Sequence, residues 1–580
     1  MSVVEEAHRP LIGAPEAFER PVFQRFWVSP AGPVTEAGDS RDPRRVRELD
    51  RAVERTLGAG WSVQQIAGSG AYEILPERGV AESSIRMGTV WDEAYALRDV
   101  PGIEHASPHF IVERESGEQP GGEVCRLAAA VESDVGRAQD LPEAATNPEW
   151  SLGPAGANVL AAHARFETVG HEPGTGQRLG HPDTGYRPYP EIWPRNGLPV
   201  PILAENGWDF LDDNADPTDD LVFLWPGHGT KTASVIVSPK GPQLVANAGA
   251  WVSGVAPGAR LIPLRVTRSV ALHDMTALVQ AVERAAGLGP NGNADRVDVV
   301  SISLGGLPDR ALRRAIREAW RRNVIVLAAA GNSVRTVVWP ARYREVIAVA
   351  ATNVRSDPWA GSSRGAAVDI AAPGQSVWCA GTRKHDGEVI DCIGMSSGTS
   401  FAVATTAGVA LLWLDWHHDD TRLADLRRHP GAVPSAFRNT VRNAARRPSG
   451  WDSERFGAGI VDALGTIETP LPAPRAVPEA LAKEAPCQED LATLLSVFEG
   501  LPDARLRVTR LLGTTNPALC EVSRVADEIA LHYALDALVR DTIDALATRE
   551  PPGEDRYAAA RTALLGSDIS RRLRVTLEDQ

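Results

Sequence analysis

Short runs of apolar residues alternate with helical segments over residues 149–469, and this alternation limits the fold most strongly. Val297–Ile302 and Val324–Ala330 are such runs, and Ala311–Arg322 and Phe401–Leu414 have the length and composition of helices. A strand that is apolar at successive positions is buried on both faces, as in a parallel sheet covered by helices. The sequence therefore predicts an α/β domain with a doubly wound, mainly parallel sheet.

Two further regions flank this domain, as expected for a chain of 580 residues. Residues 1–115 show the order strand, helix, strand, strand, helix, strand, which is typical of a ferredoxin-like α+β domain. The strands are expected at 21–29, 61–67, 71–76 and 102–113, and the helices at 42–57 and 91–100. Residues 488–580 have amphipathic spacing, with helices expected near 490–501, 505–512, 525–548 and 555–565, and predict a separate helical bundle.

The segments between these regions predict linkers. Residues 116–148 are rich in Gly, Pro, Ala and acidic residues, and residues 470–487 are rich in proline. The first of the two is long enough and loose enough to hold a processing site. We therefore expect three folded domains joined by two extended connections.

Composition excludes some classes of partner. The formal charge of -15, with no dominant basic face, argues against nucleic acid. The longest apolar stretches are too short to cross a bilayer, so no membrane contact is expected. The N-terminus lacks the basic start and apolar run of a secretory signal, which predicts a cytoplasmic location. Cys379 and Cys392 either pair across a hairpin or stay buried thiols, and the missing signal favours thiols.

Three glycine-flanked motifs carry the residue types needed for acyl transfer. They are Asp-Thr-Gly at 183–185, His-Gly-Thr at 228–230 and Gly-Thr-Ser at 398–400. Acyl transfer needs a hydroxyl nucleophile, an imidazole that takes its proton, and a carboxylate that orients the imidazole. Ser400 opens a helix, where the positive end of the dipole favours an oxyanion. Asp183, His228 and Ser400 are therefore the candidate catalytic residues.

These motifs, in this order, resemble the subtilase (S8 serine peptidase) family, over about Trp150–Ala463. The resemblance includes further segments: GWDFLDDNADP at 207–217, GVAPGARLIPLRV at 254–266, DVVSISLGG at 298–306, AAPG at 371–374 and FGAGIVDA at 456–463. It implies a subtilisin-like serine endopeptidase that hydrolyses polypeptides through an acyl-enzyme on Ser400 and requires no cofactor for the chemistry. Asn332, in Ala-Ala-Gly-Asn, matches the residue that donates to the oxyanion.

The resemblance also places the substrate. An extended peptide is expected to lie along Ser303, Leu304, Gly305 and Gly306, held by β-augmentation. Val338 falls at the floor of the first pocket. A valine there shortens the pocket and keeps it apolar, which predicts small or medium apolar side chains before the scissile bond.

The chain departs from the family pattern at two places. His181 and Pro182 precede Asp183 where apolar strand residues are usual, and the proline predicts that strand pairing is interrupted. His181 either tunes Asp183 or is a histidine behind the site or at the surface; we favour the second interpretation. Ala404 and Thr405 stand where the resemblance predicts Pro and His, which indicates a divergent branch and not an inactive enzyme.

The segment ahead of His228 is strongly acidic. It contains Asp209, Asp212, Asp213, Asp216, Asp219 and Asp220. Oxygen-rich loops of this kind hold a structural Ca²⁺ in many subtilases, but the spacing matches no defined calcium motif. A structural calcium site and a solvated acidic loop both stay open.

The flanking domains suggest how such a peptidase is controlled. Tyr95–Val112 resembles part of a subtilase propeptide, which implies inhibition by the N-terminal domain and self-cleavage within 116–148; a permanent accessory domain is the alternative. An alternative function is the protease component of a bacterial signalling or defence system, in which the C-terminal helices dock a protein partner and the protease is the output. A non-catalytic peptide-binding homologue is a further alternative, against which the complete set of motifs argues.

Overall fold

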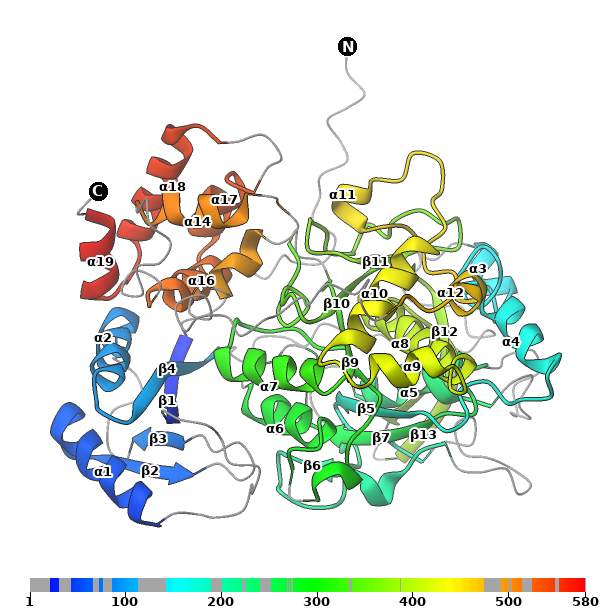
Figure 1. Cartoon of the computed structure of the whole chain (residues 1–580), viewed down its shortest axis with the longest axis horizontal. Coiled ribbons are helices and arrows are strands. Elements are labelled where there is room, and N and C mark those ends of the chain that lie inside the picture. The colour runs from blue at the N-terminus through cyan, green and yellow to red at the C-terminus, as the bar shows by residue number, and fades with distance from the viewer. Residues whose placement is uncertain are drawn as a thin grey trace.

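The computed structural model describes most of the chain (Figure 1). The described residues are 21–30, 43–65, 72–76, 86–112, 142–188, 201–221, 226–239, 252–268, 270, 272, 275–289, 291–332, 336–385, 388–473, 491, 493–498, 501, 503–513, 524–547 and 552–578. Most of the predicted processing segment 116–148 and of the proline-rich linker 470–487 lies outside them. Across the described residues, no helix is both long and apolar enough to cross a membrane.

The predicted parallel sheet is confirmed. Seven strands pair in parallel in the order β11-β10-β9-β8-β5-β7-β6. They are β5 (Arg178–Asp183), β6 (Trp208–Asp209), β7 (Arg260–Arg265), β8 (Val299–Ile302), β9 (Ile325–Ala329), β10 (Ile347–Thr352) and β11 (Ile370–Pro373). Helices α5 (His228–Val237) and α8 (Thr399–Trp416) pack on this sheet, as do α6 (Thr276–Ala285) and α7 (Arg310–Arg321) (Figure 1).

Alternating residues of the central strands enter two different cores. On β8, Val300 and Ile302 belong to the cluster that contains α6 and α7, whereas Val299 belongs to the cluster that contains α5 and α8. On β9, Val326 belongs to the cluster with α6 and α7, and Leu327 belongs to the cluster with α5 and α8. Side chains of a strand point alternately to its two faces, so both faces of the sheet are buried. This burial explains why the strands read as continuous apolar runs.

The expected interruption at Pro182 occurs on one side only. The β5–β8 register ends at Gly180, whereas the β5–β7 register continues through Asp183 opposite Arg265. The main-chain groups of β5 alternate between its neighbours, and the Asp183 carbonyl accepts from Val266 N. Pro182 therefore faces β8, where its missing N–H ends the ladder.

The N-terminal region forms an antiparallel sheet with the order β2-β3-β1-β4, which is the ferredoxin-like arrangement. Its strands are β1 (Pro21–Pro30), β2 (Trp61–Gln65), β3 (Tyr72–Pro76) and β4 (Ile103–Val112), and its helices are α1 (Pro43–Leu57) and α2 (Met87–Arg98). All six elements lie within a few residues of their predicted positions. Phe26, Ile74 and Leu97 are fully buried at the centre of this region.

The C-terminal region is helical, as predicted, with α14 (Ala504–Leu511), α16 (Ala526–Leu535), α17 (Ala537–Asp544), α18 (Glu554–Gly566) and α19 (Arg571–Glu578) after the 3₁₀ turn η4 (Ser496–Phe498). The single helix expected over 525–548 is divided at Asp536, whose carboxylate accepts from Leu538 N and Val539 N and caps α17.

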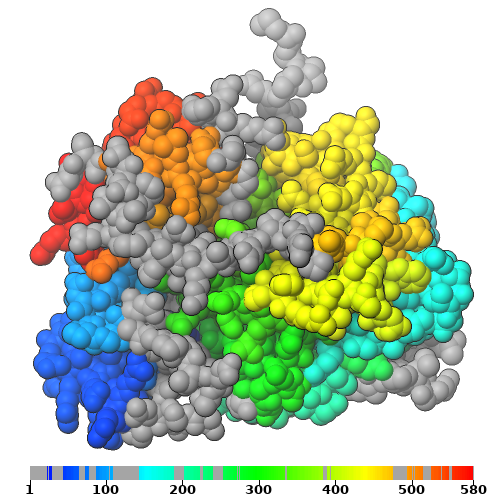
Figure 2. All heavy atoms as spheres, viewed as in Figure 1, coloured from blue at the N-terminus to red at the C-terminus, as the bar shows by residue number. Residues whose placement is uncertain are grey.

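The expectation of a separate bundle is wrong, because one continuous hydrophobic cluster joins these helices to the catalytic region and to the N-terminal region. The space-filling view shows the blue N-terminal and orange-to-red C-terminal parts together along one side of the green-to-yellow catalytic part (Figure 2).

The remaining elements complete the catalytic region. They are α3 (Pro142–Thr146), α4 (Val159–Glu167), η1 (Ala204–Asn206), η2 (Gly292–Ala294), α9 (Thr421–Leu426), α10 (Ala432–Asn443), α11 (Ser453–Phe456), α12 (Ala463–Glu468) and the hairpin β12 (Val377–His385) with β13 (Glu388–Ser396). Across that hairpin Cys379 pairs with Gly394 and Cys392 with Gly381, so the two cysteines are not cross-strand partners. Cys379 is a buried thiol, which agrees with the interpretation we favoured.

Candidate active site

Asp183 and His228 lie in direct contact at the carboxyl end of β5. His228 Nδ1 lies 2.7 Å from Asp183 Oδ1, and both side chains are buried. A carboxylate can only accept, so the proton of this hydrogen bond resides on Nδ1. The Nε2 atom is then the position on the ring that can take up a further proton.

The glycines of the two motifs allow this approach. A Cβ at Gly229 would collide with the carbonyl oxygen of Gly185, and Gly185 has a φ of +102°. Without side chains at either position, the first turn of α5 lies against the end of β5. Thr184 fixes the same corner, because its hydroxyl accepts from Gly229 N and donates to Asp219 Oδ2 at 2.6 Å.

Electrostatics keep Asp183 ionised. Burial alone would raise the pKa of Asp183, but the charge of His228, its hydrogen bond and the Thr184 N–H outweigh burial and hold the pKa below its usual value. An ionised Asp183 keeps His228 in the tautomer that leaves Nε2 free.

His181 is fully buried behind this pair, so a surface position is excluded. Its Nε2 lies 3.0 Å from Thr232 Oγ1 and 3.8 Å from Asp183 Oδ2. Burial lowers the pKa of His181 from 6.5 to about 4; the charge of Asp183 opposes this shift and that of His228 adds to it. The ring is therefore neutral at neutral pH.

Ser400 lies at the start of α8, against the strand next to β5. Its hydroxyl donates to the Ser303 carbonyl at 3.3 Å, and Ser303 directly follows β8. Since β5 and β8 are neighbours in the sheet, the Asp183–His228 pair and Ser400 lie at the same carboxyl edge. Helices α5 and α8 also pack against each other.

Asn332 is held with its amide nitrogen available. Thr399 donates from N and from Oγ1 to Asn332 Oδ1, both at 2.8 Å. A main-chain N–H can only donate, which identifies the bonded atom as the oxygen. The Nδ2 group lies beside Gly398, two residues before Ser400, and the Asn332 side chain is exposed. The arrangement presents an N–H donor next to the Ser400 amide, which has no helical acceptor in the first turn.

The expected substrate strand and pocket floor lie together. Val338 is half-buried, and a Cβ on Gly305 would lie 2.7 Å from Val338 Cγ2. Ser303 and Leu304 are buried at the end of β8. The main chain of Gly305 is not free, however: its N–H donates to Val270 O at 3.2 Å, and its carbonyl accepts from Leu272 N at 2.8 Å. A peptide that pairs with Gly305 has to replace these two bonds.

Three carboxylates of the acidic loop, Asp209, Asp212 and Asp220, pair with arginines. Arg265, at the end of β7, donates to Asp209 at 2.6 Å and to Asp220 at 2.5 Å, and Arg268 pairs with Asp212 and Asp220. The Arg265 guanidinium stands where a cation bound by these carboxylates would have to lie. The described residues contain no group of acidic, histidine or cysteine side chains arranged to hold a metal ion. Asp209, Asp212 and Asp220, which pair with these arginines, therefore do not fit a calcium site.

The second departure from the family pattern leaves α8 intact. Ala404 and Thr405 are fully buried within a continuous helix, and Thr405 Oγ1 bonds to the Phe401 carbonyl. An alanine is the best helix former, so the replacement of proline at this position removes no helical hydrogen bond.

Sequence reasoning missed three threonines that shape the site: Thr184, Thr232 and Thr399. Thr232 lies one helical turn after His228, and its hydroxyl bonds to the His228 carbonyl at 3.1 Å. The spacing of four residues on one helix was the available signal. Thr184 and Thr399 are motif residues next to Asp183 and Ser400, whose hydroxyls we had not used.

Comparisons with known proteins show the family of the chain. The model of the subtilase family matches residues 183–459. The chain is 30% identical over 242 residues to subtilisin DY of Bacillus licheniformis, which covers 41% of this chain and 76% of that protein. It is 29% identical over 287 residues to thermitase of Thermoactinomyces vulgaris, with 49% and 88% covered.

A solved structure, fervidolysin from Fervidobacterium pennivorans, a keratinolytic enzyme related to subtilisin, matches 78% of this chain and 62% of its own length. The TM-score is 0.50 at 19% identity, so this likeness concerns the fold alone. With the family model, the relatives and the α/β fold in agreement, the chain belongs to the subtilase family and is a subtilisin-like serine endopeptidase.

Proposed function

We propose that Ser400 is the nucleophile, His228 the general base, Asp183 the residue that orients His228, and Asn332 the side-chain donor to the oxyanion. The observation that carries this assignment is the buried contact of 2.7 Å between His228 Nδ1 and Asp183 Oδ1. This contact occupies Nδ1 and leaves Nε2, on the other side of the ring, as the atom that the proposal assigns to the Ser400 hydroxyl.

In the proposed reaction, side chains and main-chain amides of this protein provide all the catalytic groups. Rotation of the Ser400 hydroxyl away from the Ser303 carbonyl directs it to His228 Nε2, which takes the proton as Oγ attacks the peptide carbonyl. Asn332 Nδ2 and the Ser400 amide stabilise the resulting oxyanion. His228 then gives the proton to the leaving amine, and water hydrolyses the acyl-enzyme on Ser400 by the same route.

Fluorophosphonate labelling tests the assignment. The wild-type chain should be labelled once, on the peptide that contains Ser400, and Ser400→Ala should abolish labelling. Ser397→Ala is the matched control, because Ser397 lies three residues away and its hydroxyl accepts from Ser376 N. Labelling that survives in Ser400→Ala, or that disappears equally in Ser397→Ala, would refute the role of Ser400.

We further propose that the pocket above Val338 accepts small or medium apolar side chains. Support comes from the position of Val338 beside Gly305 and Gly331, where its methyl groups shorten the space between the two glycines. Digestion of a peptide library should show cleavage after residues such as Ala and Val. Preferred cleavage after Lys or Arg would contradict this proposal.

We also propose that the N-terminal domain inhibits the peptidase. Ser107 and Pro108 of β4 share a small cavity with Leu307 and Pro308, which directly follow the substrate strand. β4 ends at Val112, and the predicted processing segment 116–148 follows it in the chain. Mass spectrometry of the termini should show cleavage within 116–148 in wild type and an intact chain in Ser400→Ala. Identical processing of the two proteins would exclude self-cleavage.

A further inference from the structure

We propose that the C-terminal helical domain supports the primary specificity pocket, and that Tyr533 is the positioning residue that holds the pocket floor through Arg342 and Trp339. This inference rests on the proposed assignment of Val338 to the floor of that pocket. It gives the helical domain a part in substrate selection that the amphipathic spacing of its helices did not indicate.

The pocket floor is a short segment, residues 336–342, that crosses between the two expected walls. Val338 N donates to the Ala330 carbonyl at 3.0 Å, and Gly306 N donates to the Trp339 carbonyl at 2.9 Å. The segment is thus bound on one side to the chain that leads to Asn332 and on the other to the substrate strand. A displacement of Trp339 would move Val338 relative to both walls.

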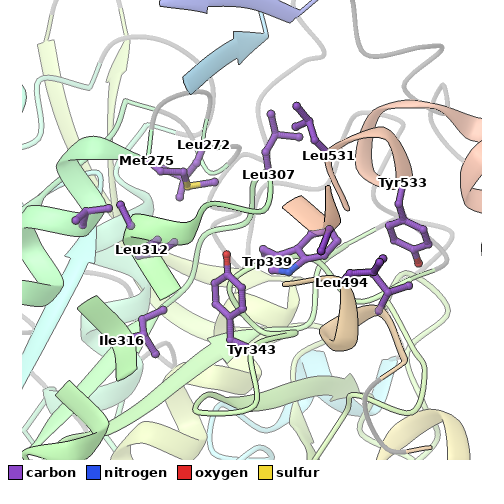
Figure 3. Close-up of a cluster of buried hydrophobic side chains, with 14 of the residues drawn as sticks. Leu272, Met275, Leu307, Leu312, Ile316, Trp339, Tyr343, Leu494, Leu531 and Tyr533 are labelled. Atoms are coloured by element: carbon purple, nitrogen blue, oxygen red, sulfur yellow. The ribbon is translucent and has the colours of Figure 1, made fainter. Parts of the chain in front are cut away.

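Trp339 also extends into the helical domain. Its indole Nε1 donates to Ser496 Oγ at 3.2 Å, and its ring meets Tyr533 edge-on, with centroids 6.0 Å apart. In Figure 3, Trp339 lies among Leu307 of the catalytic region and Leu494, Leu531 and Tyr533 of the helical region. Trp339 is 3% exposed, so the helical domain forms its packing environment together with the catalytic region.

Arg342 makes polar contacts between the pocket floor and the helical domain. The buried guanidinium donates to the Val337 carbonyl on its own segment, to the Val497 carbonyl at 3.1 Å and to Tyr533 Oη at 2.7 Å. Tyr533 Oη in turn donates to Asp544 at 2.7 Å. The Tyr533 hydroxyl therefore links the buried cation of the catalytic region to a carboxylate of the helical domain.

In this geometry, the position of the pocket floor depends most on the Tyr533 hydroxyl. A hydrogen bond between a neutral group and a charged one typically contributes about ten- to hundredfold to an equilibrium. Loss of the hydroxyl leaves Arg342 with one fewer acceptor in a buried site and separates it from Asp544. The packing of the ring against Trp339 would remain.

The test compares Tyr533→Phe with Tyr557→Phe in the full chain. Tyr557, on α18, is buried in the helical domain among groups of that domain, so its variant makes the same chemical change away from residues 336–342. Hydrogen exchange by mass spectrometry should show the amides of 336–343 exchanging about tenfold faster in Tyr533→Phe than in Tyr557→Phe. Equal protection in the two variants would overturn the inference, whether or not the cleft is open to substrate.

Cleavage of peptides that differ only in the residue before the scissile bond provides the functional measurement. The ratio of kcat/KM for small over large apolar residues should fall in Tyr533→Phe and stay unchanged in Tyr557→Phe. Val338→Ala serves as the reference for the pocket itself. No change in Val338→Ala would refute the pocket assignment under the proposed function. A change in Val338→Ala without one in Tyr533→Phe would refute the support by the helical domain.

Discussion

His181 should make this protein lose stability in mild acid. The side chain is fully buried, and burial lowers its pKa from 6.5 to about 4 even though the Asp183 carboxylate lies 3.8 Å away. Between these two pH values the unfolded chain binds a proton on His181 that the folded chain does not. The free energy of unfolding therefore falls as the pH is lowered through this window.

The size of the effect follows from the pKa difference. One pKa unit corresponds to about 1.4 kcal/mol, so complete passage from pH 6.5 to about 4 removes on the order of 3 kcal/mol. Asp183 contributes in a different window. Its folded pKa is held below its ordinary value of 3.8, so its contribution is present above that pH and is lost only as the pH falls further.

Urea unfolding of the Ser400→Ala chain, which avoids self-digestion, measures the contribution of His181 to the free energy of unfolding. The loss of stability between about pH 7 and about pH 4.5 should be roughly 2–3 kcal/mol smaller when His181→Leu is added. Since His105 and His532 lie elsewhere and are present in both proteins, their contributions cancel in the comparison. Parallel pH profiles for the two proteins would refute the reasoning, because they would mean that His181 is protonated as readily when folded as when unfolded.

Other perturbations follow from the same contacts. Asn332→Ala should reduce kcat for a peptide substrate by about 100- to 1000-fold with little change in KM, and a smaller loss would argue against oxyanion donation. Addition of EGTA should leave the melting temperature unchanged, because arginines pair with Asp209, Asp212 and Asp220 of the acidic loop; a clear decrease would point to a bound calcium ion. Arg265→Ala should lower the free energy of unfolding, measured in urea, by about 3 kcal/mol, because it leaves the 1%-exposed Asp209 without its cation. Arg268→Ala, at an exposed site, should lower it by less than about 1 kcal/mol.

The candidate triad could be predicted because each reacting residue lies in a short motif whose neighbours serve it locally. Gly185 and Gly229 allow the approach of α5 to β5, and Thr399 holds Asn332 beside Ser400. The position of His181 could not be predicted in the same way. It depends on contact with Thr232, 51 residues away, and hence on how α5 crosses the sheet.

The partners of the acidic loop could not be predicted from the sequence either. A run of carboxylates is compatible with a metal ion, with solvent or with arginines, and the choice depends on side chains from another element. Arg265 is 45 residues from Asp220 and 56 from Asp209, and it reaches both because β7 pairs with β6 and β5. Amphipathic spacing likewise predicts that the C-terminal helices bury an apolar face, but it does not say that Trp339 lies against that face.

The position of the helical domain also bears on how an inhibitory N-terminal domain would leave. Tyr95 of α2 donates to the buried Glu528 of α16 at 2.8 Å, and Arg98 donates to the Arg524 carbonyl at 2.9 Å. A cut within 116–148 removes the covalent connection but none of these contacts. Dissociation would remove the Tyr95 hydrogen bond, whereas Ser570 N and Ser570 Oγ would still donate to Glu528. Since α16 carries both Glu528 and Tyr533, the proposed release of the N-terminal domain and the proposed support of the specificity pocket would depend on the same helix.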